Sequence, residues 1–383
     1  MAMTMDMKFI PVCTPALLGN EMKYVEDAVR STWISSKGRY LEEFEKIFAQ
    51  FTGTSYAVST TSGTAALHLA LKALGIRKGD EVILPTFTMI STAFAGCYCQ
   101  AMPVFVDCQR DTWNIDVEKI EEKITPRTKA IMVVHIYGHP CDMDPIIEIA
   151  KKYGLLIIED AAEAHGAEYK GKKCGAFGDA ACFSFYANKI ISTGEGGMVV
   201  TNDLHIYEKL QYFKNLAFPL NAPRLYEHND IGFNYRMSNL HAAIGLAQLE
   251  NIDTYINARR RNARLYNERL SEIDGITTPV EKEWAKNVYW MYSILVEDDF
   301  GLSRDELMQK LLAEKIDSRP FFVPMHKQKS LREYGCNCSG NYPVADEISR
   351  KGLYLPSSSS LTEEDIGYIC DTLKSFTSIG IAR

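Results

Sequence analysis

The chain has 383 residues, of which 46% are hydrophobic and 24% charged, and its 42 Lys and Arg against 49 Asp and Glu give a formal net charge of −7. This acidic balance, with no basic run, argues against a nucleic-acid-binding protein, and no stretch reaches the roughly 18 apolar residues that cross a membrane. Residues 1–8 lack the apolar core of a signal peptide, so we expect a cytoplasmic protein.

The ten cysteines are scattered along the chain. Cys97 and Cys182 lie in apolar stretches, a pattern typical of buried free thiols in a reducing compartment. The Cys97/Cys99 and Cys336/Cys338 pairs have no histidine at zinc-finger spacing, and we therefore predict no metal site.

Short apolar runs alternate with helical patterns from about residue 56 to residue 203. The runs are rich in β-branched residues, which predicts strands buried on both faces of a sheet. Helices are expected over about 64–74, ending at Gly75, and over about 145–153, ending at Gly154. The predicted strands are 56–58, 81–84, 103–106, 130–134, 155–158, 181–185 and 197–200.

Strands that alternate with helices predict an α/β fold around a mostly parallel sheet, in which ligands bind beyond the carboxyl ends of the strands. A long helix is then expected over about 238–270, a strand over 288–296, and helices over 304–314 and 362–376. We predict a large ligand-binding domain at 1–250, which includes the N-terminal segment, and a smaller α+β domain at 251–383.

Three short patterns could carry chemistry. A buried strand ends in Glu159 and Asp160, which could face a ligand or be solvated loop acids. Lys189 follows another strand amid apolar residues, either as a desolvated amine able to form a Schiff base or as a snorkelling surface lysine. Gly63 and Thr64 open a helix, as a phosphate cradle or as an ordinary helix start.

Together these patterns supply a phosphate cradle, an acid for a ring nitrogen and a lysine, which are the three groups that pyridoxal 5′-phosphate (PLP) requires. The acid keeps the pyridine nitrogen protonated so that the ring withdraws electrons, and the lysine holds the cofactor and moves protons. The sequence therefore predicts PLP as the cofactor, with pyridoxamine 5′-phosphate as its amine-carrying intermediate form.

At these residues the sequence resembles fold-type I (aspartate aminotransferase-like) PLP-dependent transferases, and more narrowly the sugar aminotransferases of the DegT/DnrJ/EryC1/StrS family. The resemblance extends from about Ile10 to the C-terminal helix, and its motifs occur in the family's order. They are Ser31-Thr32-Trp33-Ile34-Ser35-Ser36, Ser62-Gly63-Thr64-Ala65, Val134-His135-Ile136-Tyr137-Gly138-His139-Pro140, Glu159-Asp160-Ala161-Ala162-Glu163-Ala164, Ser184 five residues before Lys189, Gly194-Glu195-Gly196-Gly197 and Gly232-Phe233-Asn234-Tyr235-Arg236-Met237.

The resemblance implies three roles around the cofactor ring. Lys189 would carry the cofactor and act as the general acid and base. Asp160 would pair with the pyridine nitrogen, and Glu163 would lie near the ring hydroxyl. Because related 3-dehydrases have a histidine at the position of Lys189, the lysine favours transamination.

The cofactor phosphate would be bound by residues of two subunits. The resemblance implies that Gly63, Thr64 and Ser184 contact it within one chain. Asn234, and on one reading Arg236, would reach the phosphate of the neighbouring subunit, so we expect a homodimer with two shared sites.

One position departs from the family pattern. The family places an aromatic ring over the cofactor in the loop after the second strand, where this chain has Pro85-Thr86-Phe87-Thr88-Met89. By register Met89 would stack through its sulfur, and a slipped register would bring Phe87 there instead.

Candidate substrate residues follow from the same resemblance. Trp33 could form a wall of the sugar pocket or only pack, and Ser35 could touch the substrate. Arg236 and Arg319 could bind the glutamate carboxylate or the diphosphate. His326 could close over the sugar nucleotide or be a solvated loop histidine.

Within the family, the motifs look most like those of enzymes that move an amino group from L-glutamate to C4 of GDP-4-keto-6-deoxymannose, releasing 2-oxoglutarate. That product would serve bacterial surface polysaccharide, such as the O-antigen of lipopolysaccharide. Alternatives are a dTDP- or UDP-linked keto sugar, amination at C3, another PLP reaction on an amino acid, or a non-catalytic regulator. Lys189 and the lack of a helix-turn-helix pattern weigh against the regulator.

Overall fold

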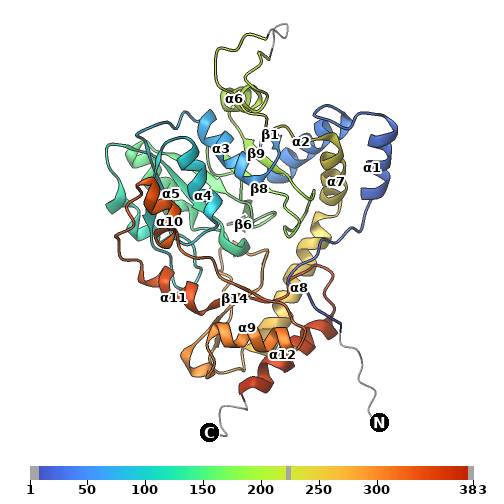
Figure 1. Cartoon of the computed structure of the whole chain (residues 1–383), viewed down its shortest axis with the longest axis vertical. Coiled ribbons are helices and arrows are strands. Elements are labelled where there is room, and N and C mark those ends of the chain that lie inside the picture. Colours follow the sequence, from blue (N-terminus) through green and yellow to red (C-terminus); the bar gives the residue numbers. More distant parts are fainter. Residues whose placement is uncertain (1–7, 221–225, 378–383) are drawn as a thin grey trace.

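The computed structural model describes residues 8–220 and 226–377 and is built around one seven-stranded sheet (Figure 1). The strand order is β1-β9-β8-β5-β4-β2-β3, and in this sheet only β9 runs antiparallel to its neighbours. The fold is therefore α/β with a mostly parallel sheet, as predicted. The strands are β1 Tyr56–Thr60, β2 Glu81–Pro85, β3 Met102–Val106, β4 Thr128–Val134, β5 Leu156–Asp160, β8 Ala180–Ser184 and β9 Gly197–Thr201.

Helices cover both faces of this sheet and continue into the C-terminal part of the chain (Figure 1). Gly75 (φ 82°) and Gly154 (φ 65°) follow α3 and α5 in the left-handed conformation, which confirms them as helix stops. The α-helices are α1 Glu21–Arg30, α2 Arg39–Thr52, α3 Gly63–Ala73, α4 Ile90–Tyr98, α5 Met143–Tyr153, α6 Leu204–Lys214, α7 Asn239–Glu250, α8 Ile252–Leu270, α9 Arg304–Ala313, α10 Lys329–Tyr334, α11 Pro343–Lys351 and α12 Glu363–Thr377. Short 3-10 turns lie at Val117–Lys119, Glu121–Lys123, Ile136–Gly138, Asp298–Phe300 and Met325–Lys327.

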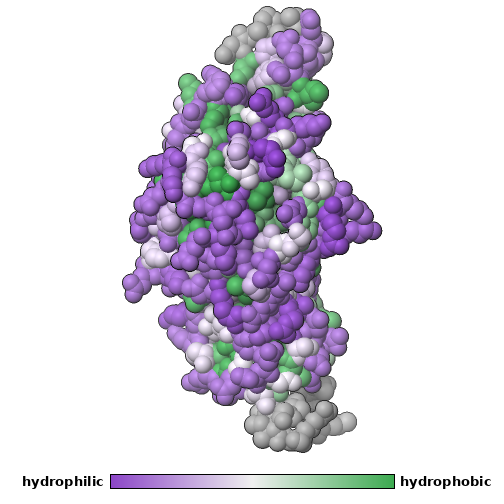
Figure 2. All heavy atoms as spheres, turned by 90° about the vertical axis from the view of Figure 1, so that its left-hand side faces the viewer, coloured by the Kyte–Doolittle hydropathy of each residue, from purple (hydrophilic) through white to green (hydrophobic). Residues whose placement is uncertain are grey.

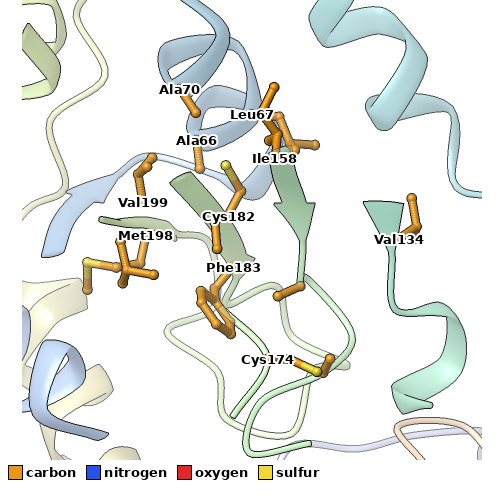
Figure 3. Close-up of a cluster of buried hydrophobic side chains, with 14 of the residues drawn as sticks. Ala66, Leu67, Ala70, Val134, Ile158, Cys174, Cys182, Phe183, Met198 and Val199 are labelled. Carbon is orange, nitrogen blue, oxygen red and sulfur yellow. The ribbon is translucent and has the colours of Figure 1, made fainter. Parts of the chain in front are cut away.

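The core of the large sheet explains why its strands lack a polar face. Figure 3 shows Ala66 and Ala70 of α3 on the side of β8 that carries the Cys182 sulfur, whereas Phe183 points to the opposite side. All of these side chains are buried. Successive strand residues point to opposite faces, so a strand covered on both sides must be apolar throughout.

Two predicted elements are wrong in extent. The helix expected over 238–270 is interrupted at Asn251, whose φ of −111° is not helical and whose side-chain amide donates to the Ala247 carbonyl at 3.2 Å. The strand expected over 288–296 is only β12, Ser293–Val296, because Tyr289 has a φ of 47° and cannot continue a strand.

The C-terminal part contains a four-stranded sheet and its own buried cluster. The sheet has the order β10-β12-β14-β13, with β10 Ile276–Thr277, β12, β14 Gly352–Tyr354 and β13 Arg319–Pro320. The cluster draws on buried side chains between 263 and 373 and on Ile10. A three-stranded sheet of β11 Ala285–Lys286, β6 Glu168–Tyr169 and β7 Lys172–Lys173 links sequence-distant segments. The division into domains at 250 remains a prediction.

The surface on the side of α5 and α10 is mostly hydrophilic, with hydrophobic side chains gathered in its upper half (Figure 2). In the described ranges, no helix combines the length and the apolar character needed to span a membrane. Nor does any group of three or more His, Cys, Asp and Glu side chains in the described ranges form a metal cluster. All ten cysteines lie in the described ranges as free thiols.

Candidate active site

Lys189 lies beyond the carboxyl end of β8, in a buried setting. Its Nζ lies 3.8 Å from Oε1 of Glu163 and 3.7 Å from the centroid of the Trp290 ring. Burial lowers the pKa of Lys189 below its ordinary value, and the nearby Glu163 and Asp160 carboxylates only partly oppose this effect. The structure therefore favours the desolvated amine over the snorkelling surface lysine.

Glu163 follows β5 and is buried beside Lys189. Its Oε2 accepts a hydrogen bond from the backbone N–H of Tyr137 at 2.8 Å, which leaves Oε1 facing the lysine. Burial raises the pKa of Glu163 to about 7, against the lowering effect of Lys189. Tyr137 itself has a φ of 52°, an uncommon conformation for a non-glycine residue that the surrounding structure must hold.

Asp160 is the last residue of β5 and is also buried. Its Oδ2 accepts a hydrogen bond from the Thr92 hydroxyl at 2.7 Å, and its Oδ1 accepts one from the Ala162 N–H at 3.2 Å. Burial raises the pKa of Asp160, and these two hydrogen bonds oppose the rise. Thr92, on α4, is a site residue that the sequence analysis missed, since an isolated threonine in a helix carries no signal.

The neighbouring Glu159 points to the other side of the sheet and is held as a structural carboxylate. It accepts hydrogen bonds from His135 Nε2 at 3.0 Å and from the backbone N–H groups of Gly175, Phe177 and Gly178, each at 2.7 Å. Burial alone would raise the pKa of Glu159, but these donors outweigh it and keep the pKa below its ordinary value.

His135 acts as a core hydrogen-bonding residue. Its Nδ1 accepts from the Cys141 N–H at 3.0 Å, so the Nε2 proton is the one donated to Glu159. His135 is fully buried, and both of its ring nitrogens are occupied by these contacts. These contacts give His135 a structural role in the core.

The end of β8 and the start of α3 meet at Gly63. A Cβ built on Gly63 would lie 2.8 Å from the Cβ of Ser184, so this close approach requires glycine. Ser62 caps α3 by accepting from the Ala65 N–H at 3.1 Å, and Thr64 donates its hydroxyl to Ser91 at 2.9 Å. The backbone N–H groups at this helix start, with Ser184 beside them, form a cradle suited to an anion.

The two residues considered for ring stacking have different surroundings. Phe87 is fully buried and packs against Tyr137, Phe321 and Phe322 at centroid distances of 6.1, 5.6 and 6.2 Å. Met89 lies at the start of α4 and is 48% exposed. The geometry therefore favours Met89, because Phe87 is already committed to an aromatic core.

Trp33 and Ser35 lie in the turn between α1 and α2. The Asn239 side-chain amide donates to the Trp33 carbonyl and the Asn239 N–H donates to the Ser35 carbonyl, both at 2.6 Å. Trp33 is 57% exposed and, with Arg236, lines an open groove of about 950 Å³. Lys189 is not among the described residues that line this groove.

Asn234 and Arg236 lie on the segment beside β1. The Arg236 guanidinium donates to Asn215 Oδ1 at 2.7 Å and contacts Asn234 Oδ1. The Tyr235 carbonyl between them accepts from the Thr61 N–H at 3.0 Å, which brings the segment beside the start of α3. Asn234 is exposed.

Arg319 and His326 differ in exposure. Arg319, on β13, is exposed, contacts Asp317 and donates to the Ser318 carbonyl at 2.9 Å. His326 is buried between Thr86 Oγ1 at 2.8 Å and Asp346 Oδ1 at 3.0 Å, and burial lowers its pKa despite Asp346. The alternative of a solvated loop histidine is therefore wrong.

Trp290 belongs to none of the motifs that the sequence analysis singled out. The structure places its ring against Lys189 Nζ, and its Nε1 donates to the Asn188 carbonyl at 2.8 Å. The contact joins residues 101 positions apart in the chain, and no local pattern could reveal it.

Comparison with known proteins places these residues in a family. The model of the DegT/DnrJ/EryC1/StrS aminotransferase family matches residues 15–374. The chain is 46% identical to a GDP-perosamine synthase of Escherichia coli O157:H7 over 97% of this chain and 100% of that protein. It is also 46% identical to a GDP-perosamine synthase of Caulobacter vibrioides over 96% of this chain and 98% of that protein.

Solved structures support the same placement. S. venezuelae DesV, determined in complex with a ketimine intermediate, is 35% identical and superimposes with a TM-score of 0.87 over 94% of each chain. The family match covers nearly the whole chain, from the α1 region to α12. This chain belongs to the DegT/DnrJ/EryC1/StrS aminotransferase family.

Proposed function

We propose that this chain is a PLP-dependent aminotransferase that moves the amino group of L-glutamate to C4 of GDP-4-keto-6-deoxymannose and so produces GDP-perosamine. The observation that carries the proposal is Lys189, a desolvated lysine flanked by Glu163 and near Asp160. The choice of sugar is supported by relatives named GDP-perosamine synthase that are 46% identical over nearly the full chain.

The residues at the strand ends fit the cofactor. Gly63 leaves no room for a side chain against Ser184, which keeps the start of α3 open to a phosphate. We infer that Gly63, Thr64 and Ser184 hold the phosphate and that Asp160 pairs with the ring nitrogen. Glu163 would lie near the ring hydroxyl, and Met89 would cover one ring face. When bound, PLP supplies an electron-withdrawing ring that stabilises negative charge at the carbon next to the amine.

Lys189 would hold the cofactor at rest and move a proton once released. Its lowered pKa increases the share of free amine near neutral pH, which is the form that accepts a proton. Thr92 keeps Asp160 in place, and the Tyr137 N–H fixes Glu163. Burial of all three ionisable groups excludes water and strengthens their mutual interaction.

We propose that the functional unit is a homodimer. Apolar side chains are exposed on α1, in the α1–α2 turn and at positions 220 and 231, where a single chain would leave them in water. They include Met22, Val29, Trp33, Ile34, Leu220 and Ile231. In such a dimer Asn234 would reach the partner's phosphate cradle, and Arg236 would support it through the contact between their side chains.

Four further residues are proposed to contact or support the substrate site. Trp33 and Ser35 would border the sugar pocket, and the exposed Arg319 would meet a carboxylate or the diphosphate. His326 would act by holding the 325–327 turn against Thr86. A cytoplasmic location and a role in surface polysaccharide, such as O-antigen, remain predictions.

An absorbance spectrum tests the reaction in one cuvette. We expect a visible band from the lysine-linked cofactor, its loss on adding L-glutamate, and its return on adding GDP-4-keto-6-deoxymannose. Return only with a dTDP- or UDP-linked keto sugar would keep the chemistry and refute the GDP-linked substrate. Absence of the band after PLP is supplied would contradict the proposal and favour the non-catalytic alternative.

A further inference from the structure

Trp290 makes two contacts with the Asn188–Lys189 pair. Its indole ring lies 3.7 Å from Lys189 Nζ, measured to the ring centroid. Its Nε1 donates to the carbonyl of Asn188, the residue immediately before the lysine, at 2.8 Å. A single side chain thus restrains both the backbone entering Lys189 and the amine at the end of its side chain.

Trp290 is itself fixed by several neighbours. Its carbonyl accepts from Nη1 of the buried Arg259 at 2.7 Å, and its ring stacks on Tyr137 at 6.2 Å with an interplanar angle of 24°. Tyr289, just before it, has a φ of 47° and donates its N–H to Asn287 Oδ1 at 2.8 Å. The surrounding structure holds this uncommon backbone conformation, so the indole is held in place before any ligand binds.

Arg259 also links the N-terminal segment to this network. Its Nη2 donates to the Cys13 sulfur at 3.4 Å, and the Cys13 thiol in turn donates to the Asn188 carbonyl at 3.4 Å. The Asn188 carbonyl therefore accepts from both Trp290 and Cys13. These two donors come from distant parts of the chain and converge on one carbonyl, which indicates that the position of this peptide is tightly set.

The face of the Trp290 indole favours the charged form of the Lys189 amine. An ammonium over an indole is attracted by the negative face of the ring, whereas a neutral amine gains much less. The other titratable groups around Lys189 are Glu163, Asp160, Cys13 and His165. Glu163 and Asp160 also favour the ammonium, whereas burial opposes it.

We propose that Trp290 is a positioning residue that holds the Lys189 amine, when it is not bonded to the cofactor, between the indole face and Glu163. The inference rests on the proposed role of Lys189. An aminotransferase lysine must leave the cofactor, stay within reach and carry a proton. Trp290 keeps the released amine beside Glu163 and favours its protonated form.

The test compares Trp290→Leu, which removes the ring and its N–H, with Trp290→Phe, which keeps an aromatic face. The rate of reductive methylation of Lys189 is followed against pH by peptide mass spectrometry in the apoprotein, so no amino donor or sugar is needed. Without the indole the ammonium is less favoured, so we expect Lys189 to react roughly 3- to 10-fold faster near neutral pH in Trp290→Leu, with an intermediate effect in Trp290→Phe.

A matched control is Trp284→Phe, because Trp284 packs against Tyr169 and His139 at 5.1 and 5.4 Å instead of against the lysine. We expect this variant to keep the wild-type pH profile. An unchanged profile in Trp290→Leu would overturn the proposal. A shifted profile in a protein that fails to aminate any sugar would refute the proposed function while supporting the role of Trp290.

A second measurement does not depend on the folding of Trp290→Leu. In the wild-type apoprotein, indole fluorescence should change with pH at the midpoint of Lys189 methylation, because the charge against Trp290 changes. Lys189→Met should abolish that transition. Persistence of the same transition in Lys189→Met, or its absence from the wild type, would refute the contact between the Lys189 amine and the Trp290 ring.

Discussion

The site around Lys189 and the groove beside Trp33 differ in how complete they are within a single chain. At the site, Glu163 and Asp160 are buried, the Lys189 side chain is only 10% exposed, and each has a partner at a defined distance. In the groove, Trp33 is 57% exposed. The difference indicates that one chain builds the ionisable centre, whereas the groove is open to solvent, and it is this groove that the proposed second copy would cover.

The largest expected effect is at Lys189. Lys189→Ala should lower turnover by about 10⁴-fold or more, because both the cofactor attachment and the proton carrier are lost. Amine transfer to the sugar, followed by chromatography, measures this loss. Lys173→Ala is the matched control, since Lys173 also lies over an aromatic ring, but that of Phe51, at 4.1 Å, and not that of Trp290. Near-normal turnover in Lys189→Ala would contradict the assignment.

Substitutions of the adjacent carboxylates Asp160 and Glu159 should have different effects, the first on turnover and the second on stability. Asp160→Asn should reduce turnover by roughly 10²- to 10³-fold with little change in folding, since the charge that would face the ring nitrogen is lost. Glu159→Gln should instead cost about 2–4 kcal/mol in the free energy of unfolding, because a buried carboxylate with several donors is replaced. Thermal unfolding and turnover of both variants distinguish these effects, and equal behaviour of the two variants would refute the separation.

Glu163 should make the stability of the apoprotein depend on pH. Its folded-state pKa is raised from 4.5 to about 7, so the folded chain binds this proton more tightly than the unfolded chain. The resulting stabilisation is complete below about pH 4.5 and is lost as the pH rises through about 7, a change on the order of 3 kcal/mol. Urea unfolding between pH 5 and 8 measures it. Glu163→Gln should flatten this part of the profile, and an unchanged slope would contradict the assignment.

Much of the fold follows from local sequence, whereas several site contacts do not. The seven predicted strands are all found because apolar, β-branched runs have few alternatives in a covered sheet. Helix α2 was not predicted, although Tyr40, Leu41, Phe44 and Phe48 have helical spacing and are buried. The helix break at Asn251 was not predicted because it depends on a hydrogen bond from one side chain to the backbone.

The residues of the site also differ in whether the sequence could predict them. Asp160, Glu163 and Lys189 stand next to strand ends, so their approach could be predicted from the parallel topology. Trp290 and Thr92 contact Lys189 and Asp160 only through tertiary packing. The burial of His326 also depends on Asp346 of α11, which no spacing rule connects to it.

The smallest expected effect lies in the groove. Trp33→Ala should raise the KM for the sugar nucleotide or weaken self-association by about 10-fold or less, because an exposed side chain adds limited contact area. The absorbance of the lysine-linked cofactor should not change. Sedimentation at several concentrations, with steady-state kinetics, measures both effects. Loss of the cofactor band in Trp33→Ala would show that the groove and the Lys189 site are not separate.

The most direct test of the central claim is borohydride reduction of the PLP-loaded protein, followed by peptide mass mapping. We expect the reduced phosphopyridoxyl group on Lys189 and on no other lysine. Attachment to a different lysine, or the absence of any attachment in protein that has been supplied with PLP, would contradict the account.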